Sequence, residues 1–115
     1  MDQKDNSELK MIKDIILNTV EVEQIYLFGS FAYGTPNEES DFDIYVVLPD
    51  NGERPLKAVQ KINMALSRMD IRAVDIVAGT ETQFIENSKA PTLERIVMRK
   101  GVRLHERQEL YQTMA

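Results

Sequence analysis

The stretch IYLFGSFAYGTPNEESDFDIYVVL, residues 25–48, decides the fold of this chain. Two apolar runs enclose a polar centre, a pattern that predicts a strand, a tight turn, a loop and a second strand. The first run ends at Gly29 and Ser30. A glycine backbone and a hydroxyl at the start of a short helical turn can offer N–H groups and an oxygen to an anion. This pair is therefore a candidate phosphate-binding site.

The second apolar run opens with two carboxylates, Asp41 and Asp43. Because side chains alternate along a strand, we expect both carboxylates on one face and Phe42, Ile44, Val46 and Leu48 on the other. A hard cation such as Mg²⁺ takes one or two protein carboxylates and fills its other positions with water and phosphate oxygens. The sequence thus predicts a site for Mg²⁺ or Mn²⁺ beside the phosphate site.

A Gly-Ser pair, ten further residues and then Asp-x-Asp in an apolar strand resembles the polymerase-beta-type nucleotidyltransferases, specifically the minimal nucleotidyltransferases. The resemblance covers about residues 24–104. It implies that Gly29 and Ser30 bind the phosphates of ATP or another nucleoside triphosphate. It also implies that Asp41 and Asp43 bind the metal, and that Asp75 completes a catalytic, metal-binding set of three carboxylates.

The same resemblance implies an α/β (α+β) fold in which a short mixed sheet, antiparallel between its first two strands, is flanked by helices. The implied activity is transfer of a nucleoside monophosphate to a hydroxyl acceptor, in the manner of a protein adenylyltransferase. The implied partner is a small helical HEPN-type ribonuclease toxin, which the chain would neutralise as an antitoxin. One position departs from the pattern, since Tyr33 stands where many members carry a basic residue.

Asp75 lies in an apolar third strand expected over residues 72–77. A buried carboxylate without a partner would be costly, so a salt bridge to Arg72 or Arg95 is one interpretation. Together with the two aspartates of the second strand, it becomes instead the third corner of a carboxylate cluster. We favour the cluster.

Helical spacing of apolar residues predicts a first helix over about residues 5–20, with Asp5 and Glu8 as a capping pair. A second helix, over about residues 55–68 with Pro55 in its first turn, should carry an apolar stripe that includes Leu56. A helix of that length between two strands favours parallel pairing of the second and third strands.

Two short helices should follow the third strand. Thr80 and Gln83 form a capping-box signature for the first, and the second should begin near Pro91 and stop at Gly101. Residues 102–104 are expected to add a short edge strand.

The composition is that of an ordinary globular protein, with 115 residues, 43% of them hydrophobic, a net charge of −5 and no cysteine. We expect one domain over residues 1–115, without a separate substrate domain. The acidic balance argues against long nucleic acid as a partner. The absence of an apolar run of membrane-spanning length, the polar start and the lack of cysteine favour a cytoplasmic protein.

Alternatives remain for both residues and function. Glu38 and Glu39 could be extra metal ligands, but acidic residues in a polar loop are usually only solvated, and the lone His105 is expected at the surface. The chain could be a non-catalytic antitoxin or binding module of the same fold. It could also be a metal-dependent phosphohydrolase that uses the same carboxylates on a phosphate ester.

Overall fold

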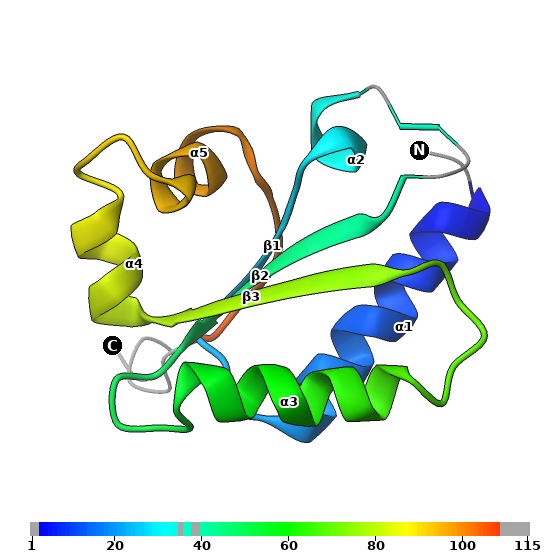
Figure 1. Ribbon diagram of the computed structural model, residues 1–115, viewed down its shortest axis with the longest axis horizontal. Coiled ribbons are helices and arrows are strands. Elements are labelled where there is room, and N and C mark those ends of the chain that lie inside the picture. The colour runs from blue at the N-terminus through cyan, green and yellow to red at the C-terminus, as the bar shows by residue number, and fades with distance from the viewer. Residues whose placement is uncertain (1–2, 35, 38–39, 109–115) are drawn as a thin grey trace.

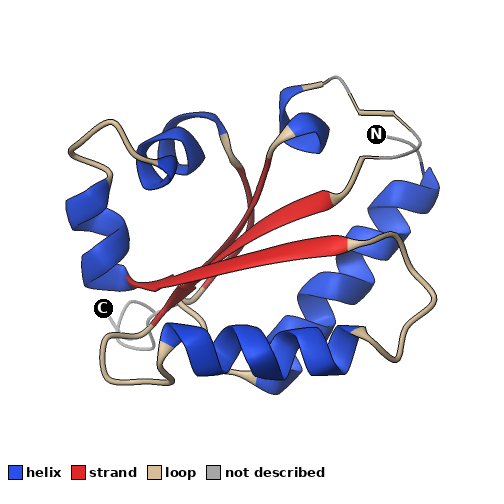
Figure 2. Cartoon of the chain, in the orientation of Figure 1, coloured by secondary structure: helices blue, strands red, loops and turns tan. Residues whose placement is uncertain are grey.

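The computed structural model describes residues 3–34, 36–37 and 40–108. Along this part the elements are α1 (Gln3–Thr19), β1 (Gln24–Phe28), α2 (Ser30–Tyr33), β2 (Phe42–Leu48), α3 (Pro55–Leu66), β3 (Val74–Thr80), α4 (Glu81–Asn87), α5 (Leu93–Lys100) and β4 (Val102–Glu106) (Figure 1). Figure 2 shows helices on both sides of a central sheet.

The sheet has four strands in the order β3-β2-β1-β4. β1 is antiparallel to both β2 and β4, whereas β2 and β3 are parallel. The helix α3 makes the crossover between the two parallel strands, as their separation in sequence requires. The expected mixed sheet, with antiparallel pairing of the first two strands, is confirmed. The predicted edge strand after Gly101 is confirmed as β4.

The strand β2 has apolar side chains on both faces, which explains why its sequence is so continuously apolar. On one face Phe42 and Ile44 belong to the larger core cluster, which includes residues of α1 and α3. On the other face Tyr45 and Val47 pack with Phe84 of α4 and other residues of a smaller cluster. The helices α1 and α3 lie on one side of the sheet and α4 and α5 on the other (Figure 1).

The predicted capping pair at the start of the first helix is wrong. The helix α1 begins at Gln3, so Asp5 and Glu8 lie within it and are only 8% and 9% exposed. A Glu8 carboxylate oxygen accepts a hydrogen bond of 2.8 Å from the backbone N–H of Arg72, and Asp5 forms an ion pair with the Arg72 side chain. The spacing of Asp5 and Glu8 is typical of a capping pair, but their partner, Arg72, is 64 positions after Glu8 in the sequence. Local spacing cannot predict a contact between residues so far apart.

The other helices follow the sequence more closely. Pro55 is in the first turn of α3, but the buried stripe consists of Ala58, Ile62 and Leu66, spaced by one helical turn. Leu56, expected in that stripe, is 73% exposed. The capping box of α4 is present in full, with Thr80 as the cap, and α5 starts after Thr92 rather than at Pro91. No helix of the described residues is both long and apolar enough to span a membrane.

Candidate functional site

The ends of three neighbouring strands bring together most of the residues expected at the site. Phe28 of β1 lies opposite Asp43 of β2, which in turn lies beside Asp75 of β3. Directly paired residues in adjacent strands point to the same face of a sheet. Asp43 and Asp75 are therefore neighbours on one face, and Gly29 follows immediately at the end of β1.

Gly29 touches the carboxylate of Asp43. Its backbone has φ 75° and ψ −159°, a region essentially restricted to glycine. A Cβ at this position would overlap Asp43 Oδ2, so no side chain could be accommodated without displacing the carboxylate. The glycine is thus needed both for the turn and for the close approach of Asp43.

The short helix α2 starts directly after this glycine. The amides of Ala32 and Tyr33 both donate to the Gly29 carbonyl, at 3.0 Å each, and Gly34 N donates to Ser30 O at 3.1 Å. Ser30 is therefore the first residue of a helical turn at the end of β1, where the sequence predicted it. Tyr33, at the end of α2, is exposed.

Negative charge is crowded around Asp43. Partial burial, followed by the charges of Asp75 and Asp41 and a hydrogen bond with Asp75, raises the pKa of Asp43 above its ordinary value of 3.8. A cation or a proton near these carboxylates would relieve the repulsion. The electrostatics of the site therefore favour a positively charged ligand.

Asp75 differs from the expectation of a buried carboxylate. It is exposed, in the edge strand β3. The ion pair of Arg72 is with Asp5, and Arg95 donates to the carbonyls of Ser88 and Lys89. The burial penalty that motivated the salt-bridge interpretation does not arise at this position.

Asp41 lies one residue before β2 and is exposed. It lines a hollow of about 480 Å³ together with Lys4, Ser40, Arg72 and other residues. Within residues 3–34, 36–37 and 40–108, no group of three or more His, Cys, Asp or Glu side chains is placed to hold a metal ion. A three-carboxylate metal site at Asp41, Asp43 and Asp75 stays a prediction.

Two carboxylates are sufficient for the metal in question. Asp43 and Asp75 are paired neighbours whose charges repel, and Mg²⁺ takes only one or two carboxylates, with water and phosphate oxygens as its other ligands. These residues fit such an ion. Glu38 and Glu39, considered as additional ligands, lie outside the described residues.

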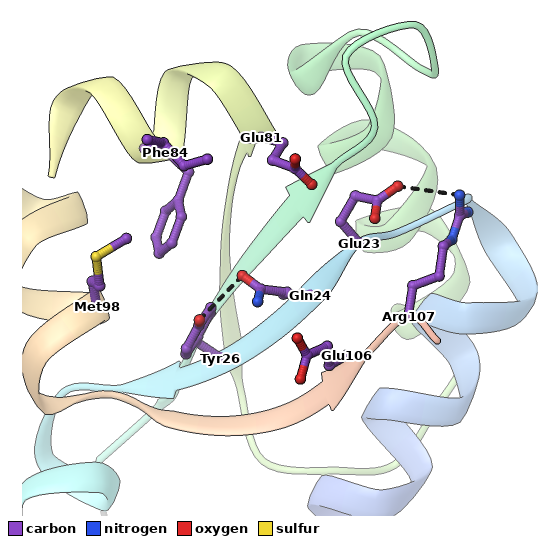
Figure 3. A pocket seen from close by; sticks show the side chains of 9 residues that line it. Glu23, Gln24, Tyr26, Glu81, Phe84, Met98, Glu106 and Arg107 are labelled. Atoms are coloured by element: carbon purple, nitrogen blue, oxygen red, sulfur yellow. Dashed lines mark hydrogen bonds and ion pairs between the residues drawn. The ribbon is translucent and has the colours of Figure 1, made fainter. Parts of the chain in front are cut away.

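A separate hollow of about 300 Å³ lies on the other part of the sheet, near the start of β1 (Figure 3). Tyr26 and Phe84 stack in it at 5.4 Å between ring centroids, and Tyr26 donates to Gln24 Oε1 at 3.1 Å. Gln24 pairs with Val47, at the opposite end of β2 from Asp43. This hollow is therefore not part of the carboxylate site.

His105 is partly buried in β4, where it pairs with Ile25. The strand β4 is separated from β2 by β1, so this histidine is not among the residues around Asp43. Sequence reasoning considered Arg72 only as a counter-ion for Asp75. Alternation along the third strand places Arg72 with Val74 and Ile76, on the face opposite Asp75, and this face does pack against the larger core. It does not predict the contacts of Arg72 with Asp5, Phe31 and Ser40.

Comparison with known protein families shows the family to which this chain belongs. The family model described as "Polymerase beta, Nucleotidyltransferase" matches residues 10–110. The chain belongs to the polymerase-beta nucleotidyltransferase family. The match includes both the Gly-Ser pair and the Asp-x-Asp motif, so the resemblance that these motifs suggested is confirmed.

Solved structures agree with this membership of the nucleotidyltransferase family. A chain from a crystal structure of a toxin–antitoxin with AMP-PNP is 27% identical, with a TM-score of 0.53, over 88% of this chain and 74% of that one. A chain from an MntA–HpeT toxin–antitoxin mutant is 26% identical with the same coverage and TM-score.

A third structure supports the fold alone. A putative nucleotidyltransferase from Sulfolobus solfataricus is 21% identical, with a TM-score of 0.55, over 93% of this chain and 90% of that one. No curated protein is a significant match to this chain.

Proposed function

We propose that this chain is a metal-dependent nucleotidyltransferase that transfers a nucleoside monophosphate from ATP or another nucleoside triphosphate to a hydroxyl on a partner protein. In this proposal residues 1–115 form one catalytic domain, and the chain acts in the cytoplasm as an antitoxin. The observation that carries it is the contact of Asp43 with Gly29, beside Asp75, in a chain of the polymerase-beta family.

The structural neighbours support both the nucleotide and the partner. One neighbour is a toxin–antitoxin with AMP-PNP, an analogue of ATP. Another is a toxin–antitoxin mutant in which two aspartates, two positions apart, are replaced by glutamate. Asp41 and Asp43 have the same spacing in this chain. A toxin partner and a nucleoside triphosphate substrate are therefore the natural proposals.

Asp43 and Asp75, with Asp41 beside them, would hold Mg²⁺ or Mn²⁺. The chemistry supplied by such an ion is neutralisation of the charge on the phosphate oxygens of the nucleotide. Gly29 and Ser30 would bind the terminal phosphates through backbone amides and the serine hydroxyl, because α2 begins at this point.

The aspartates would also handle the proton of the acceptor. As the alternative to holding the metal, Asp75, exposed beside Asp43, would accept the proton as the acceptor oxygen forms its bond to the α-phosphorus. The bond between the α-phosphorus and the bridging oxygen breaks in line with the attack, and pyrophosphate leaves. The protein's main contribution is to hold the two reactants in this arrangement.

The partner in this proposal is a small helical toxin of the HEPN type. A nucleotide added to a hydroxyl at its active site would place a bulky anion there and block it. The net charge of −5 on this chain would attract a ribonuclease partner, because a ribonuclease needs a basic surface to bind RNA.

Product analysis with radiolabelled nucleoside triphosphate, Mg²⁺ and the candidate toxin tests the activity. Transfer predicts pyrophosphate release and label on the toxin, both lost in the Asp43→Asn variant. Orthophosphate release without labelling would indicate a phosphohydrolase instead. Toxin inhibition without any nucleotide turnover would indicate a non-catalytic antitoxin.

A further inference from the structure

The side chain of Arg72 contacts residues next to both Ser30 and the Asp-x-Asp motif. Its residue stands two positions before β3, at the end of the sheet where α1, β2 and β3 begin (Figure 1). The Arg72 side chain is 23% exposed, so most of it is packed within the protein. It makes contacts with three different segments.

On one side the guanidinium is anchored to α1. Arg72 Nη2 lies 3.6 Å from Asp5 Oδ1, and the Arg72 backbone N–H donates to Glu8 Oε2 at 2.8 Å. Both acidic residues are buried within α1, and this helix packs into the larger core. Two carboxylates therefore hold the arginine from the α1 side.

On the other side the guanidinium reaches the phosphate-binding turn and the Asp-x-Asp motif. Its Cζ lies 5.0 Å from the ring centroid of Phe31 and 5.8 Å from that of Phe42, and these two rings are 4.5 Å apart. Phe31 directly follows Ser30, and Phe42 stands between the two aspartates. Arg72 Nη1 also donates to the carbonyl of Ser40 at 2.9 Å, one residue before Asp41.

We propose that Arg72 is a positioning residue for nucleotidyl transfer, which fixes α2 relative to the start of β2. The proposal rests on the proposed function above. Through Phe31 it sets the place of Ser30, and through Ser40 and Phe42 it sets the place of the aspartates. The phosphate site and the carboxylates must bind one nucleotide together, and a small error in their separation weakens every contact that depends on both.

Lysine cannot replace arginine in this role. A planar guanidinium can stack on aromatic rings while its edge donates to a carbonyl and a carboxylate in fixed directions. The ammonium group of lysine is not planar, so it cannot stack on a ring, and its donors are not held in fixed directions. The Arg72→Lys variant keeps the charge and much of the apolar stem, so it tests the geometry rather than the packing.

Calorimetric titration of the full chain with Mg²⁺ and AMP-PNP is the test, combined with thermal midpoints. Arg95→Lys is the matched control, because Arg95 is also partly buried and donates to the carbonyls of Ser88 and Lys89, in the α4–α5 connection. We expect Arg72→Lys to weaken AMP-PNP affinity about tenfold, and Arg95→Lys to change it by less than about twofold at a similar loss of thermal midpoint.

A second variant distinguishes a positioning role of Arg72 from direct contact between Arg72 and the nucleotide. The double variant Asp5→Asn/Glu8→Gln keeps the Arg72 side chain but weakens its contacts with α1. If Arg72 is a positioning residue, this variant should also bind AMP-PNP more weakly. Unchanged affinity in Arg72→Lys would overturn the proposal. Weaker affinity in Arg72→Lys with unchanged affinity in the double variant would also overturn it, since Arg72 would then bind the nucleotide itself.

Amide chemical shifts give a readout that does not depend on nucleotide binding. In the protein without ligand, Arg72→Lys should shift the amide resonances of Ser30 and Asp43, whereas Arg95→Lys should leave them unchanged. If the wild-type chain fails to bind AMP-PNP, the proposed function fails, and these shifts alone decide the positioning role. Unmoved resonances at both residues would overturn it.

Discussion

At Gly29, the backbone conformation and the neighbouring carboxylate both exclude a side chain. The positive φ of 75° disfavours any other residue, and Asp43 occupies the space where a Cβ would be. This contact joins the glycine of the proposed phosphate-binding turn to a carboxylate 14 positions later in the sequence. A change at this glycine should therefore disturb the predicted metal-binding group directly.

Gly29→Ala should abolish nucleotide transfer. Alanine must displace the Asp43 carboxylate, and the strained backbone adds a loss of stability of about 1–3 kcal/mol. Gly34→Ala is the matched control, because Gly34 also has a positive φ, of 93°, but a Cβ there would meet nothing within 4 Å. Product analysis and thermal melts measure both variants. Equal activity of the two variants would contradict a role for the Gly29–Asp43 contact.

The raised pKa of Asp43 predicts that the difference in stability between the wild-type chain and the Asp43→Asn variant depends on pH. A carboxyl group whose pKa is higher in the folded state than its ordinary 3.8 destabilises the fold once it ionises. That cost is present at neutral pH and disappears as pH falls toward 4. Asp43→Asn should therefore abolish transfer while raising the thermal midpoint at pH 7, a gain that shrinks on acidification.

Asp50→Asn is a control for the thermal midpoints of Asp43→Asn, because the pKa of Asp50 is shifted in the opposite direction. Hydrogen bonds from the Thr82 side chain and backbone lower the pKa of Asp50, so its ionised form stabilises the fold above its ordinary pKa. Its replacement should lower the thermal midpoint at pH 7, with the difference lost in acid. An unfolded or strongly destabilised Asp43→Asn variant would show that Asp43 is structural.

At the scale of single elements, the sequence predicted what depends on nearby residues. The capping box of α4 is complete, since Thr80 Oγ1 accepts from Gln83 N while Gln83 Oε1 accepts from Thr80 N. The same spacing was misleading at Asp5 and Glu8, where the partner is Arg72. Local patterns cannot distinguish a cap from an anchor that only the folded chain supplies.

Strand register explains why part of the site could be predicted and part could not. The spacing of the motifs singled out Gly29, Ser30 and the aspartates as candidate site residues, and alternation along β2 assigned its two faces. The pairing of Asp43 with Asp75 and its contact with Gly29 depend on register between strands, which sequence spacing does not fix. The exposure of Asp75 likewise depends on what the folded chain packs against that end of β3, which spacing does not show.

Thr80→Ala tests the cap that ends β3 and starts α4. Removing a threonine cap costs about 1 kcal/mol, so the thermal midpoint should fall by about 4 °C in a domain of this size. Ser88→Ala is a suitable control, because the Ser88 hydroxyl donates to a carbonyl at the other end of α4. A loss in the control as large as that in Thr80→Ala would contradict the capping argument.

The whole molecule carries an excess of negative charge, and its predicted site carries still more. A nucleoside triphosphate approaching Asp41, Asp43 and Asp75 meets like charge unless a cation lies between them. The same acidic balance would speed the encounter with a basic partner, and added salt would weaken that attraction. The negative charge of the chain would thus oppose binding of the nucleotide unless a cation is present, and would favour binding of a basic partner protein.

Divalent metal should tighten the binding of nucleoside triphosphate at least tenfold, a difference of about 1.4 kcal/mol. Calorimetric titration with AMP-PNP, in the presence of Mg²⁺ and then of a chelator, measures the effect. Repeating both titrations with Asp43→Asn should remove most of the difference. Equal affinities of the wild-type chain in the two conditions would exclude the proposed metal site.

Intact-mass spectrometry of the toxin partner tests the central claim most directly. The candidate helical toxin is co-expressed with either the wild-type chain or the Asp43→Asn variant, and its mass is compared between the two. Nucleotidyl transfer predicts that the toxin gains the mass of one or more nucleoside monophosphates only beside the wild-type chain. An unmodified toxin mass beside the wild-type chain, with the toxin nonetheless silenced, would contradict it.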